Sequence, residues 1–343
     1  MNSAAAFNTS SDNTTVPSTI VPSTVEGIAL CTAFSLSFVF IFVGNLLTIV
    51  LFAANKRLRK RSLFLVINMA FADLMLGTVS LPIYIYDVGT RFQLWKGGWP
   101  ISLSIFYTIV DVFFSQASLI SAAFLSGERF YAIYWPFKHR TLSMRTYRIT
   151  IFTLWALTLL IATSWNTSYY LISHKRAVLV CTPYVFILIF IICGCNICIW
   201  RKFRHGNIVS EQPNRDLRNK RLTKTLMLVA ILASLSWLPL ITFNCLIYVF
   251  NVQIPWKYYD LVNIINYSNS FVNPVLYALR VPEFREAWAL CFLRNLAAPN
   301  IQKDIGRKKM TLVLKPATEL RTPRTETSHL QLAFEQEVLD TKL

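Results

Sequence analysis

Residues 28–54 read IALCTAFSLSFVFIFVGNLLTIVLFAA, a run that contains no charged side chain. A helix needs about 20 predominantly apolar residues to cross the hydrocarbon core of a bilayer, so this run predicts a transmembrane span. The sequence lacks the alternating segments of roughly ten residues that are typical of membrane β-barrels. Comparable apolar runs follow at about 63–86, 101–130, 149–165, 177–200, 225–250 and 258–279. The sequence therefore predicts an all-α membrane protein, a seven-transmembrane helix bundle.

The composition of the 343 residues supports a membrane protein. Hydrophobic residues make up 54% and charged residues 15%, whereas charged residues make up about 25% of soluble domains. The net charge of +17 also occurs in nucleic-acid-binding proteins, but those place their basic residues on a polar, soluble fold. We therefore expect no nucleic acid as a partner, and membrane lipid beside the basic loops.

Basic residues gather on one side of the predicted membrane. Five of the 34 Lys and Arg residues fall in the loops after the second, fourth and sixth spans, and the other 29 fall in the remaining loops and the C-terminal segment. The positive-inside rule then places the N-terminus outside and the C-terminus in the cytoplasm. We expect a multi-pass protein of the plasma membrane.

Four segments follow from this topology. Residues 1–27 form an extracellular, disordered tail, 28–281 the bundle, 282–294 an amphipathic juxtamembrane helix and 295–343 a cytoplasmic, disordered tail. None of the seven cysteines falls in an outer loop, so no extracellular disulfide is expected. The hydroxyls at 322–328 are either phosphorylated or part of a solvated tail without a role. N-glycosylation acceptors occur at Asn8, Asn13 and Asn166, the last in the expected loop after the fourth span.

Ionisable residues inside the predicted spans need a partner or a function, because burial in the bilayer is costly. Asp111 and Arg129 lie eighteen residues apart, five whole helical turns, so they face the same way. Asp73 lies near the middle of the second span. Its carboxylate either binds a small hard cation such as sodium or is protonated in a neutral hydrogen-bond network. The oxygen donors expected to join Asp73 are those of Ser118, Asn269, Ser270 and Asn273.

An ordered set of motifs over residues 28–293 resembles the rhodopsin-like (class A) G protein-coupled receptors, and two further positions described below resemble the amine receptors among them. The motifs are Gly44-Asn45, Ala72-Asp73, Glu128-Arg129-Phe130, Pro136, Trp155, Ser236-Trp237-Leu238-Pro239 and Asn273-Pro-Val-Leu-Tyr277.

The resemblance implies a switch that activates a heterotrimeric G protein. Glu128 would hold Arg129 in the inactive state, and Asn219, where many members carry an acid, implies a weaker lock with some basal activity. Trp237 would lie beneath the ligand, with Pro239 as a hinge in the sixth span. The resemblance also assigns coupling and switch roles to Pro136, Phe137, Asn273, Pro274 and Tyr277, a palmitoylation or a buried thiol to Cys291, and arrestin as a partner of the phosphorylated tail.

The expected ligand class depends on two residues of the third and seventh spans. Asp111 matches the counter-ion position of amine receptors and Tyr267 the residue that hydrogen-bonds it, so a small biogenic amine is expected. The alternative is that internal hydrogen bonds hold Asp111 and that the ligand is a lipid or a peptide. Span five lacks the serines of amine receptors, because residues 173–176 are expected to form a short loop.

The sequence does not favour three other functions. A retinal-binding receptor needs a lysine where Tyr267 stands, so no retinal is expected. A transporter or channel would need polar residues along a continuous path, which the pattern does not favour. An enzyme is not expected, because no nucleophile–base pair or metal cluster is predicted at membrane depth.

Overall fold

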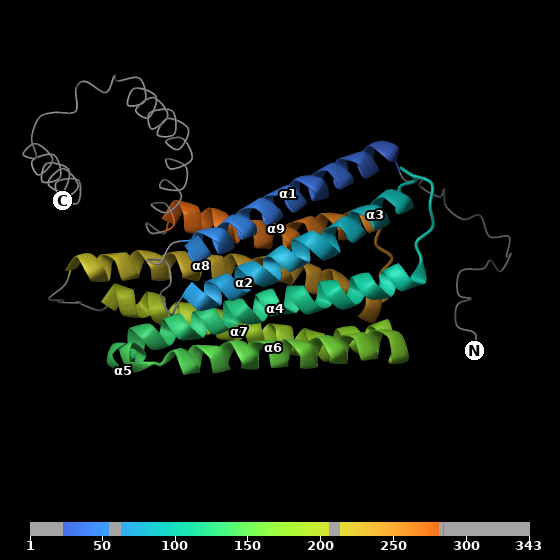
Figure 1. The fold of residues 1–343 in the computed structure, drawn as a ribbon. Coiled ribbons are helices and arrows are strands. Elements are labelled where there is room, and N and C mark those ends of the chain that lie inside the picture. Colours follow the sequence, from blue (N-terminus) through green and yellow to red (C-terminus); the bar gives the residue numbers. More distant parts are fainter. Residues whose placement is uncertain (1–22, 55–62, 206–212, 281–283, 285–343) are drawn as a thin grey trace, which may run out of the picture. The chain divides into compact units, whose positions relative to one another are not determined.

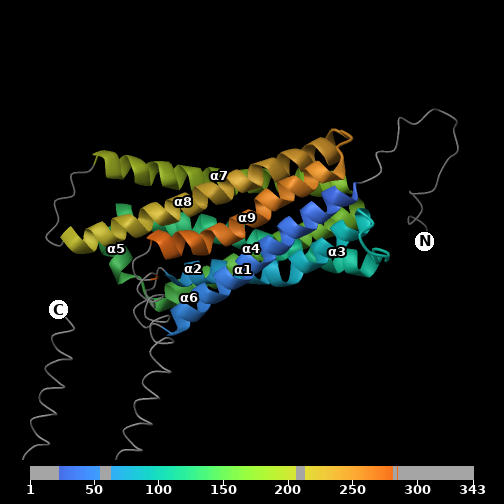
Figure 2. The same ribbon diagram turned by 90° about the horizontal axis from the view of Figure 1, so that it is seen from above.

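The computed structural model describes residues 23–54, 63–205, 213–280 and 284, and omits the side chains of residues 205–222. Long helices run alongside one another in a bundle, and a second view shows the same packing from above (Figures 1 and 2). All the elements of the described residues are helical. They are α1 (Thr24–Ala54), α2 (Leu63–Met75), η2 (Leu76–Ser80), α3 (Leu81–Arg91), α4 (Ile101–Tyr134), α5 (Pro136–Thr141), α6 (Met144–Thr167), η3 (Ser168–Ile172), α7 (His174–His205), α8 (Pro213–Asn244), η4 (Cys245–Val249) and α9 (Trp256–Arg280).

Six of the described helical segments are long and apolar enough to cross a bilayer: Thr24–Ala54, Leu63–Arg91, Ile101–Tyr134, Met144–Ile172, His174–Arg204 and Thr223–Val249. The seventh, α9, is less apolar because the run Asn266-Tyr-Ser-Asn-Ser270 lies in its middle. These polar side chains are tolerated because α9 packs against α1 and α8 inside the bundle. The predicted bundle of seven transmembrane helices is therefore confirmed.

Three short π-helical turns interrupt or end the long helices. In η2 the Leu81 N–H bonds to the Leu76 carbonyl, five residues back, just before Pro82, which has no N–H. The turns η3 and η4 close with the same spacing, at Ser173 and Phe250. Such turns are frequent at functional sites, and Tyr169 of η3 and Tyr248 of η4 line the cavity described below.

The interior holds two apolar clusters, while large apolar side chains cover the outside. One cluster joins α2, α4, α7 and α8 around residues such as Val66 and Leu125. The other joins α1, α3 and α9 around Phe34, which is fully buried. Phe152 and Phe190 are more than three-quarters exposed on the outer surface, as expected for side chains that face lipid.

The connection after α6 differs from the sequence prediction. We expected residues 173–176 to form a loop, but Ser173 alone separates η3 from α7. The Ser173 hydroxyl accepts a bond from the Arg176 N–H at 3.2 Å and so caps the first turn of α7. His174, Lys175 and Arg176 are therefore helical.

The predicted outer-loop acceptor at Asn166 is wrong in its location. Asn166 lies in the last turn of α6, half-buried, and its Nδ2 donates to the Ala162 carbonyl at 2.8 Å. The acceptor amide is therefore engaged inside the helix. The other two acceptors, Asn8 and Asn13, lie outside the described residues, as do Cys291 and the hydroxyl-rich segment 322–328.

Candidate ligand pocket and switch residues

A cavity of about 400 Å³ lies among α3, α4, α7, α8 and α9, within the range of small-molecule sites. Tyrosine and tryptophan side chains form much of its wall, and Asp111 and Trp237 both line it. Trp237 is buried and belongs to the apolar cluster that joins α2, α4, α7 and α8. The predicted ligand-binding residues therefore share one cavity.

Asp111 is anchored by a short hydrogen bond. The Tyr267 hydroxyl donates to Asp111 Oδ1 at 2.5 Å, and the Tyr107 and Tyr267 hydroxyl oxygens are 3.3 Å apart. Phe34 packs edge-on against the Tyr267 ring, with centroids 6.2 Å apart. Tyr267 lies on α9 and Asp111 on α4, so the contact that the resemblance implied joins two helices across the cavity.

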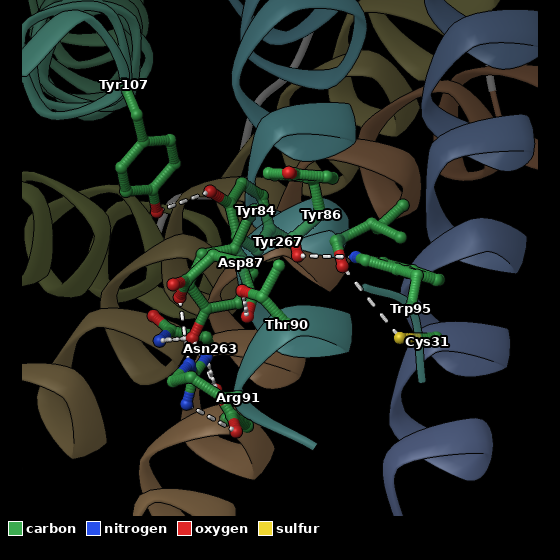
Figure 3. A network of polar contacts seen from close by, with 12 residues as sticks. Cys31, Tyr84, Tyr86, Asp87, Thr90, Arg91, Trp95, Tyr107, Asn263 and Tyr267 are labelled. Carbon is green, nitrogen blue, oxygen red and sulfur yellow. Dashed lines mark hydrogen bonds and ion pairs between the residues drawn. The ribbon is translucent and has the colours of Figure 1, made fainter. Parts of the chain in front are cut away.

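A second ionic network closes the same end of the bundle (Figure 3). The Arg91 guanidinium binds Asp260 with two nitrogens, at 3.1 and 2.9 Å, and its Nε binds Asp87 Oδ2 at 2.9 Å. The Tyr84 hydroxyl donates to Asp260 Oδ1 at 2.6 Å and accepts from Asn263 Nδ2 at 2.7 Å. The sequence interpretation missed this network. The spacing of Asp87 and Arg91, four residues apart on one helix, was its one local signal.

Asp73 is fully buried at mid-bundle and accepts three hydrogen bonds. Ser118 and Ser270 hydroxyls donate to its Oδ1 at 2.7 and 2.8 Å, and Asn273 Nδ2 donates to its Oδ2 at 2.9 Å. Asn269 Oδ1 and Asn273 Oδ1 are buried without a hydrogen-bond partner among the described residues. Three of the four residues expected to join Asp73 thus bond to it, and Asn269 contributes a buried oxygen that has no hydrogen bond among the described residues.

The Asp73 region also depends on a close approach of two helices. Asn45 Nδ2 donates to the Ser270 carbonyl at 3.0 Å and thereby joins α1 to α9. A Cβ at Gly44 would lie 3.0 Å from the Pro274 side chain, so Gly44 is the residue that lets α1 approach the α9 proline.

The Glu128 carboxylate organises the opposite end of the bundle. Its Oε2 lies 2.7 Å from Arg129 Nε, as the resemblance implied. Its Oε1 contacts His139 Nε2 at 2.7 Å and accepts from the Tyr147 hydroxyl at 3.0 Å. His139 lies on α5 and Tyr147 on α6, and both were missed because neither matches a motif.

The remaining switch residues fall into three places. Pro136 begins α5, where its missing N–H costs nothing, and Phe137 beside it is 80% exposed. Pro239 lies inside α8. Tyr277 is buried, its ring stacks on Phe284 with centroids 5.9 Å apart, and its hydroxyl has no hydrogen-bond partner in the described part of the chain. The side chain of Asn219 lies outside the described residues.

A bundle of seven membrane helices with an aromatic cavity at one end and a Glu–Arg pair at the other defines a seven-transmembrane receptor. The family model described as "7 transmembrane receptor (rhodopsin family)" matches residues 44–277. The chain belongs to this family, the rhodopsin-like G protein-coupled receptors.

Similar curated proteins extend the match beyond the family model. The adenosine receptor A3 of Canis lupus familiaris is 24% identical, over 73% of this chain and 86% of that protein. The trace amine-associated receptor 13c of Danio rerio is 23% identical, over 75% and 84%. The galanin receptor type 1 of Homo sapiens is 25% identical, over 86% and 90%.

The family fixes the general function. The chain is a multi-pass membrane receptor that converts the binding of an extracellular ligand into activation of a heterotrimeric G protein. Members of the family are signalling receptors, so the chain is not an enzyme, and the transporter or channel alternative is not supported.

Proposed function

We propose that this receptor recognises a small extracellular amine, with Asp111 as the counter-ion of the ligand's ammonium group. The observation that carries the proposal is the position of the Asp111 carboxylate in a cavity walled by aromatic rings. A carboxylate there supplies a charge-assisted hydrogen bond, and tyrosine and tryptophan faces attract the same cation. The likeness to a receptor named for trace amines supports this chemistry.

The charges around the cavity also favour a cation. Among the described residues that line it, Arg91 is the single Lys or Arg, and both Asp87 and Asp260 contact that guanidinium. An anionic ligand would therefore have to compete with two carboxylates for Arg91. Receptors named for adenosine and galanin are also similar to this chain, so a ligand of different chemistry, a lipid or a peptide, is the second candidate.

The test is a second-messenger assay on the full chain in transfected cells, with a panel of biogenic amines. Asp111→Asn keeps the size of the side chain and removes its charge, so we expect the amine response to be lost. Glu26→Gln is the matched control, because Glu26 pairs with Lys257 at 3.0 Å and does not line the cavity. An amine response that survives in Asp111→Asn contradicts the proposal. Silence to every amine, with basal signalling that Arg129→Ala abolishes, moves the search to lipids and peptides.

For the switch, we propose that Arg129 leaves Glu128 and engages the G protein when α8 moves outward. Pro239 supplies the hinge of α8, and Trp237 couples it to the ligand, because Trp237 lines the cavity. Tyr277, whose hydroxyl is unbonded within the described residues, moves inward to brace the open form. The exposed Phe137 on α5 offers an apolar contact for the G protein.

We propose a sodium ion at Asp73 as an allosteric ligand. The oxygens present fit a small hard cation, since a carboxylate, two hydroxyls and the two unpaired amide oxygens of Asn269 and Asn273 are buried there. When bound, the ion supplies a positive charge that neutralises Asp73. Asp73 and Ser270 then hold α2 and α9 together and favour the closed form.

The orientation and modifications complete the proposal. The excess of basic residues places the N-terminus outside and the C-terminus in the cytoplasm of a cell whose plasma membrane carries the receptor. Glycosylation is assigned to Asn8 and Asn13, palmitoylation to Cys291, and arrestin binding to the phosphorylated tail.

A further inference from the structure

The ionic network of Asp87, Arg91 and Asp260 contains two carboxylates and one guanidinium, so it has one negative charge in excess. Arg91 forms a two-nitrogen pair with Asp260, whose side chain is fully buried and also bonded by Tyr84. This pair is neutral and complete. Asp87 meets the same guanidinium through a single bond from Nε, and its side chain remains 21% exposed.

Asp87 faces the ligand cavity with this surplus charge. Asp87 and Arg91 line the cavity, while Asp260 does not. The other nearby cation of α9, Lys257, is paired with Glu26 and is absent from the lining residues. Because Arg91 is shared between Asp87 and Asp260, and Asp111 lies deeper down, the described part of the cavity and its network hold two more carboxylates than cations.

The two carboxylates lie at different depths. Tyr267 of α9 contacts Asp111, and Asp260, seven residues earlier on α9, contacts Arg91 beside Asp87. Seven residues of α-helix rise about 10 Å, so the α9 residues that contact the two sites lie about 10 Å apart along the helix axis.

An aromatic wall connects the two sites. The Tyr84 and Tyr107 rings stack with centroids 5.7 Å apart and both line the cavity. Tyr84 bonds the network of Asp260, and the Tyr107 hydroxyl lies 3.3 Å from that of Tyr267. A hydrocarbon chain laid along this wall would bury apolar surface between its two charged ends.

From this geometry we propose that the natural ligand class is a dication, a diamine whose two ammonium groups are separated by a hydrocarbon spacer of about 10 Å. One ammonium binds Asp111 and the other binds Asp87 at the cavity mouth. The inference rests on the proposed amine function and names its substrate class. It also assigns Asp87 as a second ligand-binding residue.

Three compounds of equal chain length test the inference on the wild-type receptor: 1,7-diaminoheptane, 7-amino-1-heptanol and n-heptylamine. We expect the diamine to signal at a concentration about tenfold lower than the two monoamines, a difference of about 1.4 kcal/mol, because the diamine alone places a second ammonium beside Asp87. Equal potency of the diamine and the monoamines overturns the inference and leaves the amine function intact. Silence to all three compounds, together with the amine panel, overturns the proposed function itself.

Variants then locate the second site. Asp87→Asn is expected to raise the half-maximal concentration of the diamine about tenfold and to leave that of n-heptylamine unchanged. Asp111→Asn is expected to abolish both responses, and Glu26→Gln, with its carboxylate outside the cavity, to change neither. An equal shift of both ligands in Asp87→Asn assigns Asp87 to the structure of the bundle and refutes its role as a ligand site. The comparison of ligands on the wild type does not depend on the folding of any variant.

Discussion

Replacing Tyr147 by Phe removes a hydrogen bond to the Glu128 carboxylate, together with the 3.2 Å contact between the same hydroxyl and His139 Nε2. The hydroxyl donates to Glu128 Oε1 at 3.0 Å, next to His139 Nε2 at 2.7 Å, while Arg129 Nε lies 2.7 Å from the other oxygen. Tyr147 is 4% exposed, so its ring stays packed in the Phe variant. If these contacts hold Arg129 in the inactive form, the variant favours the active form.

The magnitude follows from the chemistry of the bond. A hydrogen bond to a charged group contributes about 1.5–3 kcal/mol net. The remaining contact from His139 favours the lower end of this range, because one acceptor oxygen keeps a partner. A loss of about 1.5 kcal/mol raises the ratio of active to inactive receptor about tenfold. An unliganded receptor that is about 1% active then becomes about 10% active.

The assay is ligand-independent second-messenger production, scaled to the amount of receptor at the cell surface. Tyr134→Phe serves as the control, because that hydroxyl donates to the Cys198 carbonyl at 3.1 Å and removing it leaves the bonds of Glu128 in place. We expect Tyr147→Phe to raise basal signalling several-fold above wild type and above the control. Basal signalling equal to that of wild type at equal surface expression refutes the role of Tyr147 in the lock.

Further predictions concern packing and the buried carboxylate. Gly77→Ala brings the new Cβ into the Ile41 side chain, so we expect thermal unfolding of the detergent-solubilised receptor to show a loss of about 1–3 kcal/mol of stability. Gly127→Ala, where the Cβ meets open space, should gain about 1 kcal/mol, and equal stability of the two variants contradicts this packing. Trp155→Phe removes the 2.9 Å hydrogen bond from the indole N–H to the partly buried Asn68 Oδ1 on α2, so stability should fall by about 1–3 kcal/mol in the same assay. An unchanged unfolding temperature contradicts a stabilising role of this hydrogen bond. Asp73→Asn should remove the difference in basal signalling between sodium and choline buffers that we expect for wild type, and a sodium effect that persists in the variant places the ion elsewhere.

The fold was predictable because its signals are local. Each apolar run is long enough by itself to cross a bilayer. The run at 258–279 is less apolar than the others, because polar residues lie in the middle of α9, and the structure accounts for them by packing α9 against α1 and α8.

The predicted site residues had local signals of the same kind. Asp73, Asp111 and Arg129 stand out because ionisable groups are costly in a membrane. Spacing along a helix also placed Asp111, Ser118 and Arg129 near one face. The partners of these residues on other helices came from the resemblance to a family, since no local pattern links positions such as Asp73 and Asn273.

What the tertiary structure decided is which distant groups meet. Arg91 and Asp260 are 169 positions apart, and their pairing depends on how α3 and α9 pack. His139 and Tyr147 reach Glu128 because α5 and α6 fold back beside the end of α4. Asn166 is a position where the local motif predicted the wrong surroundings. The glycosylation motif was expected in a loop, but α6 continues through Asn166 to Thr167. The sequence by itself determined the number of membrane spans, because this depends on transfer from water to lipid, whereas several helices extend beyond the predicted spans, as Met144–Ile172 does beyond 149–165. The surplus charge of the cavity emerged only from packing, because a charge is neutralised or left over according to the partners that the fold brings within a few ångströms.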